Sequence, residues 1–330
     1  MTTLSDISCE DLQPIQGTRL LLTIDQNGAK ITDWAQENRQ HVERLLQENG
    51  ALLIRGLKFA GSQQFGTALS TLFGEELLPY VYRSTPRTEL RGNVYTATEY
   101  HSSQHIPQHN ENAYCNRWAL RLGFLCTLPA EQGGATPICD SETVYRQIPD
   151  ALRERFERHG VMYVRNYSDV DIPWATVFQT EDREEVEQFC TANQISFEWL
   201  DEKRLRTSQI NQASAVHPVT AARVWFNQAH LFHVSNLAAD LQKSLLSVMN
   251  ESELPRNTYY GDGSPIGLDD LQQIREIYAR NSISFDWQRN DLLLLDNMLY
   301  SHGREPFSGS RQVLVGMARA LDAAQVATSP

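Results

Sequence analysis

The chain has 330 residues, of which 41% are hydrophobic and 21% charged, and its formal net charge is -12. Length and composition of this kind predict one large globular domain, spanning residues 1–330, with a sizeable apolar core. The acidic balance argues against nucleic acid or an anionic membrane as the primary partner.

The five cysteines do not indicate a disulfide framework, because their number is odd and none forms a C-x-x-C pair. The first residues contain no basic region followed by an apolar stretch, so we expect no secretory signal. No apolar run reaches the roughly 18 residues of a membrane-spanning helix. We therefore expect a cytoplasmic protein with reduced thiols.

Apolar runs bounded by glycine and proline predict strands, and apolar residues at helical spacing predict helices. In chain order, the expected strands are 18–24, 51–56, 118–128, 161–167, 196–200, 223–228, 284–287, 291–296 and 311–319. The expected helices are 34–49, with Asp33 as its N-cap, 62–73, 141–159, 182–193, 237–249 and 268–280.

Three segments do not fit this pattern of regular elements. Residues 80–116 are polar and aromatic without helical period, and a long loop of this kind is often functional. Residues 168–215 are expected to be an insertion, either a surface subdomain or a lid over a pocket. Residues 323–330 are small and polar, and we expect a flexible tail there.

Many short strands, with helices in the first third and between later strands, favour two packed sheets over alternating βαβ units. The predicted fold class is α+β, with a double-stranded β-helix core of the jelly-roll, cupin-like kind. Flanking helices and the lid-like insertion complete the expected architecture. The mouth of such a core is a natural place for a buried metal ion.

The long polar segment contains a His-x-Glu pair, His109 and Glu111. In an extended chain, residues i and i+2 point to the same side, so both side chains can reach one metal ion. A third ligand must come from elsewhere, and His302 in the segment DNMLYSH is the best candidate. Two histidines and one carboxylate, with open positions, are the ligand set of non-haem Fe(II) oxygenases. His101 and His105 lie nearby but form no His-x-carboxylate pair.

Four motifs together resemble the taurine/2,4-D dioxygenase (TauD/TfdA) branch of the Fe(II)/2-oxoglutarate oxygenases. That pattern is His-x-Asp/Glu, Gly-Gly-x-Thr, a distal His and a following Arg. The corresponding segments here are HNE, GGATP and LLLLDNMLYSHGREPFSGSR. The subgroup that the chain resembles most is the syringomycin-pathway-like (SyrP-like) hydroxylases, which modify amino acids in nonribosomal peptide pathways. The segments that carry this likeness, from about residue 50 to 320, are NVYTATEY, VWFNQAHLFH, LPRNTYYGDGSPI and DNMLYSHGREPFSGSR.

The resemblance implies that Fe(II), 2-oxoglutarate and O2 are the cofactor and co-substrates. It implies His109, Glu111 and His302 as metal ligands, with no further catalytic residue. It also implies that Arg311 and Thr136 bind the far carboxylate of 2-oxoglutarate, because a guanidinium offers a planar fork of donors. Glu111 stands where many family members have Asp, and a carboxylate at this position favours hydroxylation over halogenation.

The implied substrate is a small amino-acid-like molecule, free or presented on a carrier protein, in specialised metabolism such as antibiotic biosynthesis. An amino acid needs an acidic or amide partner for its ammonium group and an arginine for its carboxylate. Polar residues expected near the metal are the candidates, and Arg304 is also a rival to Arg311. These candidates are Asn93, Glu99, Asn110, Asn227, His230 and Arg304.

Three alternatives remain at this stage. A desaturase or oxidative cyclase acting on a similar substrate would need the same motifs. A zinc hydrolase could use two histidines and one glutamate, but it would leave the Gly-Gly-x-Thr and Arg motifs without a role. A non-catalytic jelly-roll binding protein would not need all of the ligand set.

Overall fold

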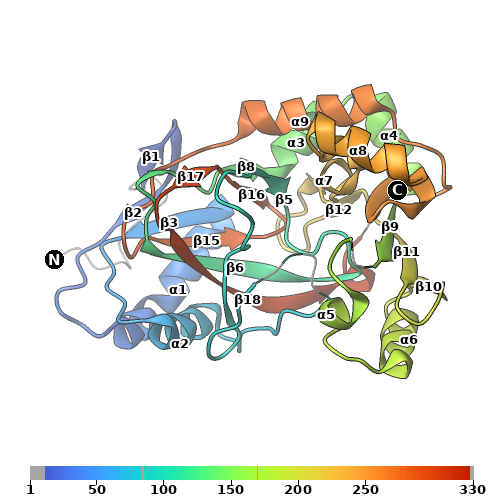
Figure 1. Cartoon of the computed structure of the whole chain (residues 1–330). Coiled ribbons are helices and arrows are strands. Elements are labelled where there is room, and N and C mark those ends of the chain that lie inside the picture. The colour runs from blue at the N-terminus through green and yellow to red at the C-terminus, as the bar shows by residue number, and fades with distance from the viewer. Residues whose placement is uncertain (1–11, 83–84, 86, 169, 328–330) are drawn as a thin grey trace.

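The computed structural model describes residues 12–82, 85, 87–168 and 170–327. Two β-sheets face each other across a layer of apolar side chains, and helices cover their outer faces (Figure 1). This arrangement confirms the predicted α+β class with a double-stranded β-helix core.

The larger sheet has seven strands, and its described pairs are antiparallel except for β2 with β3. In spatial order the strands are β1 (Gln13–Ile15), β2 (Thr18–Thr23), β3 (Ala51–Arg55), β15 (Leu292–Asp296), β6 (Arg117–Leu128), β18 (Gln312–Asp322) and β4 (Val94–Thr96). The run LLLL of β15 is buried on both faces because side chains alternate along a strand. Leu292 and Leu294 pack toward α1 (Ile31–Asn49) and α2 (Ser62–Phe73), and Leu293 and Leu295 pack into the layer between the sheets.

The smaller facing sheet has three antiparallel strands, β5 (Ile106–His109), β16 (Tyr300–Arg304) and β8 (Ile138–Asp140). Its side chains Ile138 and Tyr300 pack in the apolar layer against the larger sheet. The metal-binding motifs predicted from the sequence lie on this sheet and at its edge.

A third, four-stranded sheet extends the molecule beside the core (Figure 1). Its strands are β10 (Ser196–Trp199), β11 (Leu205–Asn211), β9 (Val161–Tyr167) and β14 (Arg256–Tyr260). The remaining strands form two short pairs, β12 (Ser214–Val216) with β13 (Arg223–Trp225) and β17 (Phe307–Ser308) with β7 (Gln132–Gly133).

A second apolar cluster joins the third sheet to most of the remaining helices. The helices beyond α2 are α3 (Ser141–Gln147), α4 (Asp150–His159), α5 (Trp174–Phe178), α6 (Arg183–Ala192), α7 (Ala229–Phe232), α8 (Ala239–Val248) and α9 (Leu268–Asn281). Short 3-10 turns occupy Val234–Asn236, Glu251–Glu253 and Ala323–Gln325.

Several predicted boundaries are wrong for identifiable reasons. The helix expected over 141–159 is two helices, because Pro149 precedes α4 and interrupts the hydrogen-bond ladder. The helix expected from residue 34 begins at Ile31, so Asp33 lies in its first turn instead of capping it. Residues 284–287 were expected to be a strand, but they form no ladder. Strands β4, β5, β11, β14 and β16 were not predicted, because their mixed polarity lacks a clear period of two, and the long loop expected over 80–116 contains β4 and β5.

The predicted insertion, 168–215, contains α5, α6, β10 and β11, and β11 pairs with β9 along its whole length. The insertion is thus part of a sheet, and its role as a lid remains a prediction. In the expected flexible tail, residues 323–325 form a turn and Val326 is buried, so this part has fixed contacts. Residues 328–330 lie outside the described part of the chain.

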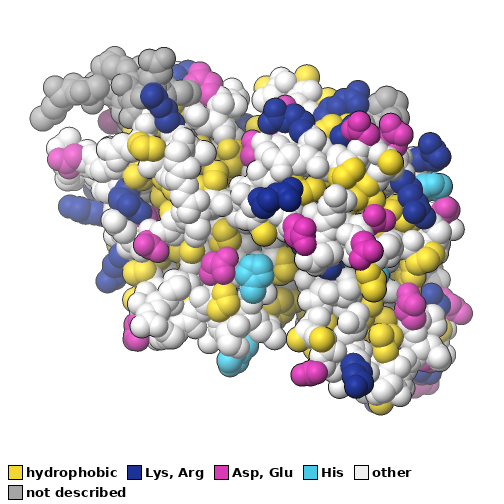
Figure 2. Space-filling model, turned by 90° about the horizontal axis from the view of Figure 1, so that it is seen from above, with side chains coloured by type: hydrophobic (Ala, Val, Ile, Leu, Met, Phe, Trp, Pro, Cys, Tyr) yellow, Lys and Arg dark blue, Asp and Glu magenta, His cyan; other side chains and the backbone are white. Residues whose placement is uncertain are grey.

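On the face shown in Figure 2, basic and acidic side chains are intermixed over the surface. Within the described residues, no helix is long and apolar enough to cross a membrane.

A buried ionic network fixes the turn that connects β15 to β16. The Asp296 carboxylate forms an ion pair with Arg121 of β6 and accepts a hydrogen bond from Nε2 of His217 (3.0 Å). Its other oxygen accepts the backbone N–H of Met298 (3.0 Å), and Arg121 also reaches Glu43 of α1 (3.1 Å). Burial raises the pKa of Asp296, but the hydrogen bond from His217 and the charge of Arg121 outweigh it and lower the pKa overall.

We predict that Asp296→Asn lowers the free energy of unfolding by about 3 kcal/mol, because it leaves the buried Arg121 without its main counter-charge. Urea unfolding followed by circular dichroism measures the loss. The control is Glu48→Gln, which removes an exposed ion pair with Arg44 and should cost less than about 1 kcal/mol. Equal small losses in both variants would contradict this role of the network.

Candidate metal centre and co-substrate site

His109 and His302 are direct cross-strand partners in the smaller sheet. His109 ends β5, His302 lies in β16, and the two residues are paired in the antiparallel register. Directly opposed side chains of such a pair point to the same face. The two imidazole rings are accordingly 4.4 Å apart between centroids. Strand pairing therefore brings together two histidines that are distant in the sequence.

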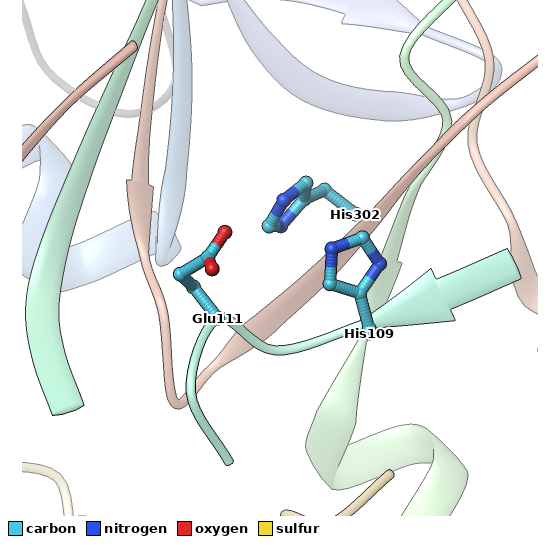
Figure 3. A group of neighbouring side chains, drawn as sticks. All are labelled: His109, Glu111 and His302. Carbon is cyan, nitrogen blue, oxygen red and sulfur yellow. The ribbon is translucent and has the colours of Figure 1, made fainter. Parts of the chain in front are cut away.

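Glu111 completes the group two residues after His109. One potential ligand atom from each of His109, Glu111 and His302 lies within 4.8 Å of the others. Figure 3 shows the carboxylate and both rings pointing toward a common centre. The structure thus brings together the three residues that the sequence predicted as metal ligands.

Asn297 holds the backbone of Glu111 in place. Its side-chain oxygen accepts the Glu111 N–H (2.7 Å), and its side-chain nitrogen donates to the Glu111 carbonyl (2.9 Å). The same nitrogen donates to the carbonyl of Ala119 on β6 (2.8 Å). Sequence reasoning did not assign this role to Asn297, although it lies in the segment DNMLYSH that carried the resemblance. Its partners are long-range, so no local pattern indicates them.

Both histidines have the protonation state that metal binding requires. Burial lowers the pKa of His109 and lowers that of His302 further, so both rings are neutral. Nδ1–H of His109 donates to the carbonyl of Pro107 (2.9 Å), which leaves Nε2 with its lone pair for a metal ion. Nδ1 of His302 is buried without a hydrogen-bond partner in the described structure. These features fit a divalent metal ion bound by the three side chains.

Arg87 was not predicted from the sequence, because it lies in the long segment without a period. Its guanidinium forms a buried ion pair with Oε2 of Glu111 (2.6 Å) and stacks on the ring of Tyr80 (4.6 Å). The pair neutralises the carboxylate while leaving Oε1 for a metal ion. Arg87 also lines a cavity of about 30 Å³ together with His109 and His302.

Thr136 and Arg311 lie on the wall of the same cavity. Arg311 donates to the carbonyl of Gly134 (2.8 Å) and to the hydroxyl of Thr136 (3.2 Å). That hydroxyl also accepts Nε1–H of Trp287 (3.0 Å), so its own hydrogen is free to donate to an anion. Burial lowers the pKa of Arg311 to about 10, and the group stays protonated at neutral pH.

The close approach of the Arg311 side chain to the turn before Thr136 requires glycine in that turn. Gly133 and Gly134 have φ of 69° and 72°, a left-handed conformation that other residues rarely adopt. A Cβ at Gly134 would lie 2.9 Å from Cδ of Arg311. The turn therefore places Thr136 and Arg311 side by side, where both can donate to one carboxylate.

Three of the predicted substrate-binding residues are buried among backbone groups. Asn110 donates to the carbonyl of Asn297 (2.7 Å), and Asn227 accepts a nearby backbone N–H (3.0 Å). Nε2 of His230 hydrogen-bonds the carbonyl of Gln108 (2.9 Å). All three therefore have fixed partners in the loops around the metal-binding group.

The other three predicted substrate-binding residues are Asn93, Glu99 and Arg304. Asn93 donates to a backbone carbonyl (2.8 Å), and Glu99 is exposed and accepts the hydroxyl of Thr96 (2.7 Å). Arg304 lines the cavity and donates to four backbone carbonyls between residues 98 and 104. A contact between any of these six residues and a substrate remains a prediction.

We predict that Asn297→Ala weakens divalent-metal binding roughly 10- to 100-fold, because Glu111 loses the clamp that orients it. Titration of the metal-free protein with Mn(II), followed by electron paramagnetic resonance, measures the affinity. Asn281→Ala, at the end of α9, is the control and should bind Mn(II) as the unmodified protein does. Unchanged Mn(II) affinity in Asn297→Ala would contradict the clamp.

Two relatives match nearly the whole chain. The dapdiamide synthesis protein DdaC of Enterobacter agglomerans is 38% identical over 298 residues, which are 90% of each chain. A clavaminate synthase-like protein of Arabidopsis thaliana is 30% identical over 305 residues, covering 88% of this chain and 87% of the relative.

Solved structures share the fold at lower identity. The PvcB protein of Pseudomonas aeruginosa superimposes with a TM-score of 0.54 at 15% identity, over 93% of this chain and 91% of PvcB. The chain also matches the taurine catabolism dioxygenase TauD, TfdA family over residues 11–318. With this match and the relatives above, the chain belongs to the TauD, TfdA family and is an Fe(II)- and 2-oxoglutarate-dependent dioxygenase.

Proposed function

We propose that this enzyme hydroxylates an unactivated C–H bond of an amino acid, or of an aminoacyl group on a carrier protein, in specialised metabolism. The observation that carries the proposal is the convergence of His109, Glu111 and His302 beside the Thr136–Arg311 pair. Bound Fe(II), with 2-oxoglutarate and O2, supplies the oxidant for such a reaction.

In this proposal the residues of the chain bind and orient the reactants. His109, Glu111 and His302 hold the metal on one side and leave the other positions open. Arg311 and Thr136 hold the far carboxylate of 2-oxoglutarate by charge-assisted hydrogen bonds. Buried apolar side chains around the group, such as Phe124 against His302, keep bulk water away.

The substrate class and pathway are proposed from the relatives. DdaC is named as a dapdiamide synthesis protein, and a solved structure of PvcB is described as an oxygenase from an isonitrile synthetic pathway. Both descriptions support specialised metabolism as the context of this enzyme. Hydroxylation is preferred to desaturation or ring closure as the simplest outcome of C–H oxidation. The substrate is proposed to be a small molecule, free or held by a carrier protein.

We also propose a cytoplasmic location. Cys115, Cys126, Cys139 and Cys190 are all free and buried, which suits a reducing compartment. Burial raises the pKa of each thiol, so these cysteines are unreactive structural residues.

The first test is the visible charge-transfer band expected when Fe(II) and 2-oxoglutarate are added without O2. We predict the band in the unmodified enzyme and its loss in His302→Ala, because that variant lacks one of three ligands. His105→Ala is the control, since His105 is exposed and pairs with the exposed Glu305 (3.7 Å). The proposal fails if His302→Ala keeps the band, or if the unmodified enzyme shows no band and forms no succinate in air.

The second test concerns the 2-oxoglutarate anchor. Arg311→Ala should raise the KM for 2-oxoglutarate roughly 10- to 100-fold, because a charged hydrogen-bond donor is lost. Arg304→Ala should raise it less, since the Arg304 side chain is already bound to backbone carbonyls. Succinate formation at varied 2-oxoglutarate gives both values. A larger effect in Arg304→Ala would reverse the assignment.

A further inference from the structure

Arg165 is a buried arginine on the inner face of the third sheet. It lies in β9 between Tyr163 and Tyr167, and its side chain is 2% exposed. The guanidinium carbon lies 4.8 Å from the centre of the Tyr167 ring and 5.6 Å from that of the Tyr82 ring. Stacking against aromatic rings stabilises a cation in part but satisfies none of its in-plane N–H donors.

None of the three guanidinium nitrogens of Arg165 has a hydrogen-bond partner in the described structure. Asp171 is the acidic residue whose charge acts on it, but that carboxylate is already bound by Arg256 through two hydrogen bonds of 2.9 Å. Burial lowers the pKa of Arg165, but the neighbouring groups outweigh this effect and raise the pKa overall, and a guanidinium stays charged at neutral pH. A buried charge without hydrogen bonds is unfavourable, and such charges in proteins are normally paired.

Tyr82, which stacks on Arg165, lines a larger cavity than the one beside His109 and His302, although Arg165 itself is not part of its wall. This cavity has a volume of about 270 Å³, and Tyr82, Cys115, Gln209 and Asn112 contribute to its wall. Gln209 lies on β11, which pairs with β9. Thr207 of β11 is the direct cross-strand partner of Arg165.

Two residues of this cavity wall are neighbours of the metal-binding group. Asn112 directly follows Glu111, and Tyr80, which also lines the cavity, is stacked on Arg87 of the smaller cavity. A molecule in the larger cavity would therefore border both Tyr82 and these neighbours of the metal-binding group.

We propose that Arg165 binds a carboxylate of the substrate and thereby fixes which carbon faces the metal ion. This inference rests on the oxygenase function proposed above and assigns a feature of its substrate, namely a free carboxylate. A planar guanidinium can pair with a carboxylate through two parallel hydrogen bonds. Substrate binding then supplies the counter-charge that the described residues do not.

The carboxylate can come from two sources. A free amino acid has its α-carboxylate, whereas an aminoacyl group bound to a carrier as a thioester has lost it. In the tethered case the carboxylate would have to belong to an acidic side chain. The proposal thus also separates the free from the carrier-bound form of the substrate.

The experiment measures thermal unfolding of the enzyme loaded with Mn(II) and N-oxalylglycine, an unreactive analogue that occupies the 2-oxoglutarate site. Each of the common L-amino acids is compared with its α-carboxamide as the added probe. For at least one free acid we expect a saturable rise in Tm of roughly 3 °C or more that its α-carboxamide does not give. Arg165→Met should lose this rise, and Arg165→Lys should keep only part of it.

The control variant is Arg155→Met, which removes an arginine that also stacks on a tyrosine, Tyr260 (4.3 Å), but is exposed. It should keep the full response. If the response follows aspartate or glutamate and is lost on amidating the side chain but not the α-carboxylate, the acidic side chain is the source.

The inference is overturned if free acids and carboxamides stabilise the unmodified enzyme equally, or if Arg165→Met responds as the unmodified enzyme does. This comparison of acids with amides in the unmodified enzyme holds even if Arg165→Met does not fold. The proposed function is tested separately. If it is wrong, the unmodified enzyme shows no anaerobic Fe(II)–2-oxoglutarate band. Failure of the inference alone leaves that band intact.

Discussion

The antiparallel pairing of β5 with β16 is the constraint on which the site depends. It sets His109 opposite His302, so that one short ladder positions two imidazoles from distant parts of the chain. Asn297, in the turn before β16, then fixes the backbone of Glu111. Asp296 holds this turn in place, because its buried ion pair with Arg121 connects the turn to the central sheet. The geometry of the metal-binding group therefore depends on contacts with the packed core.

Local signals predicted much of this arrangement. The His-x-Glu pair, the Gly-Gly turn before Thr136 and the apolar run of β15 are short patterns with direct structural meaning, and the structure brings the first two together with His302 and Arg311. The fold class followed from the number and spacing of the apolar runs. Long-range partners could not be predicted in the same way. Arg87 and Asn297 contact Glu111 from distant segments, and nothing in their own neighbourhoods indicates it.

Three arginines of this acidic protein differ in the partners that their guanidinium groups have. Arg87 already has its counter-charge in Glu111, and Arg311 is oriented by Gly134 and Thr136 toward the cavity that both histidines line. Arg165 stacks on two tyrosines, and none of its guanidinium nitrogens has a hydrogen-bond partner among the described residues. A metal-binding carboxylate, a dicarboxylic co-substrate and an anionic substrate would match these three in order. The net charge of the whole chain gives no hint of this arrangement, because it sums all charged residues without regard to where they lie.

The most direct test of the account is a crystal structure of the enzyme grown without O2 in the presence of Fe(II) and 2-oxoglutarate. The account predicts one metal ion bound by a ring nitrogen of His109, a ring nitrogen of His302 and a carboxylate oxygen of Glu111. It also predicts that the far carboxylate of 2-oxoglutarate contacts Arg311. A metal ion bound elsewhere, or a His302 ring turned away from an occupied His109–Glu111 pair, would contradict it.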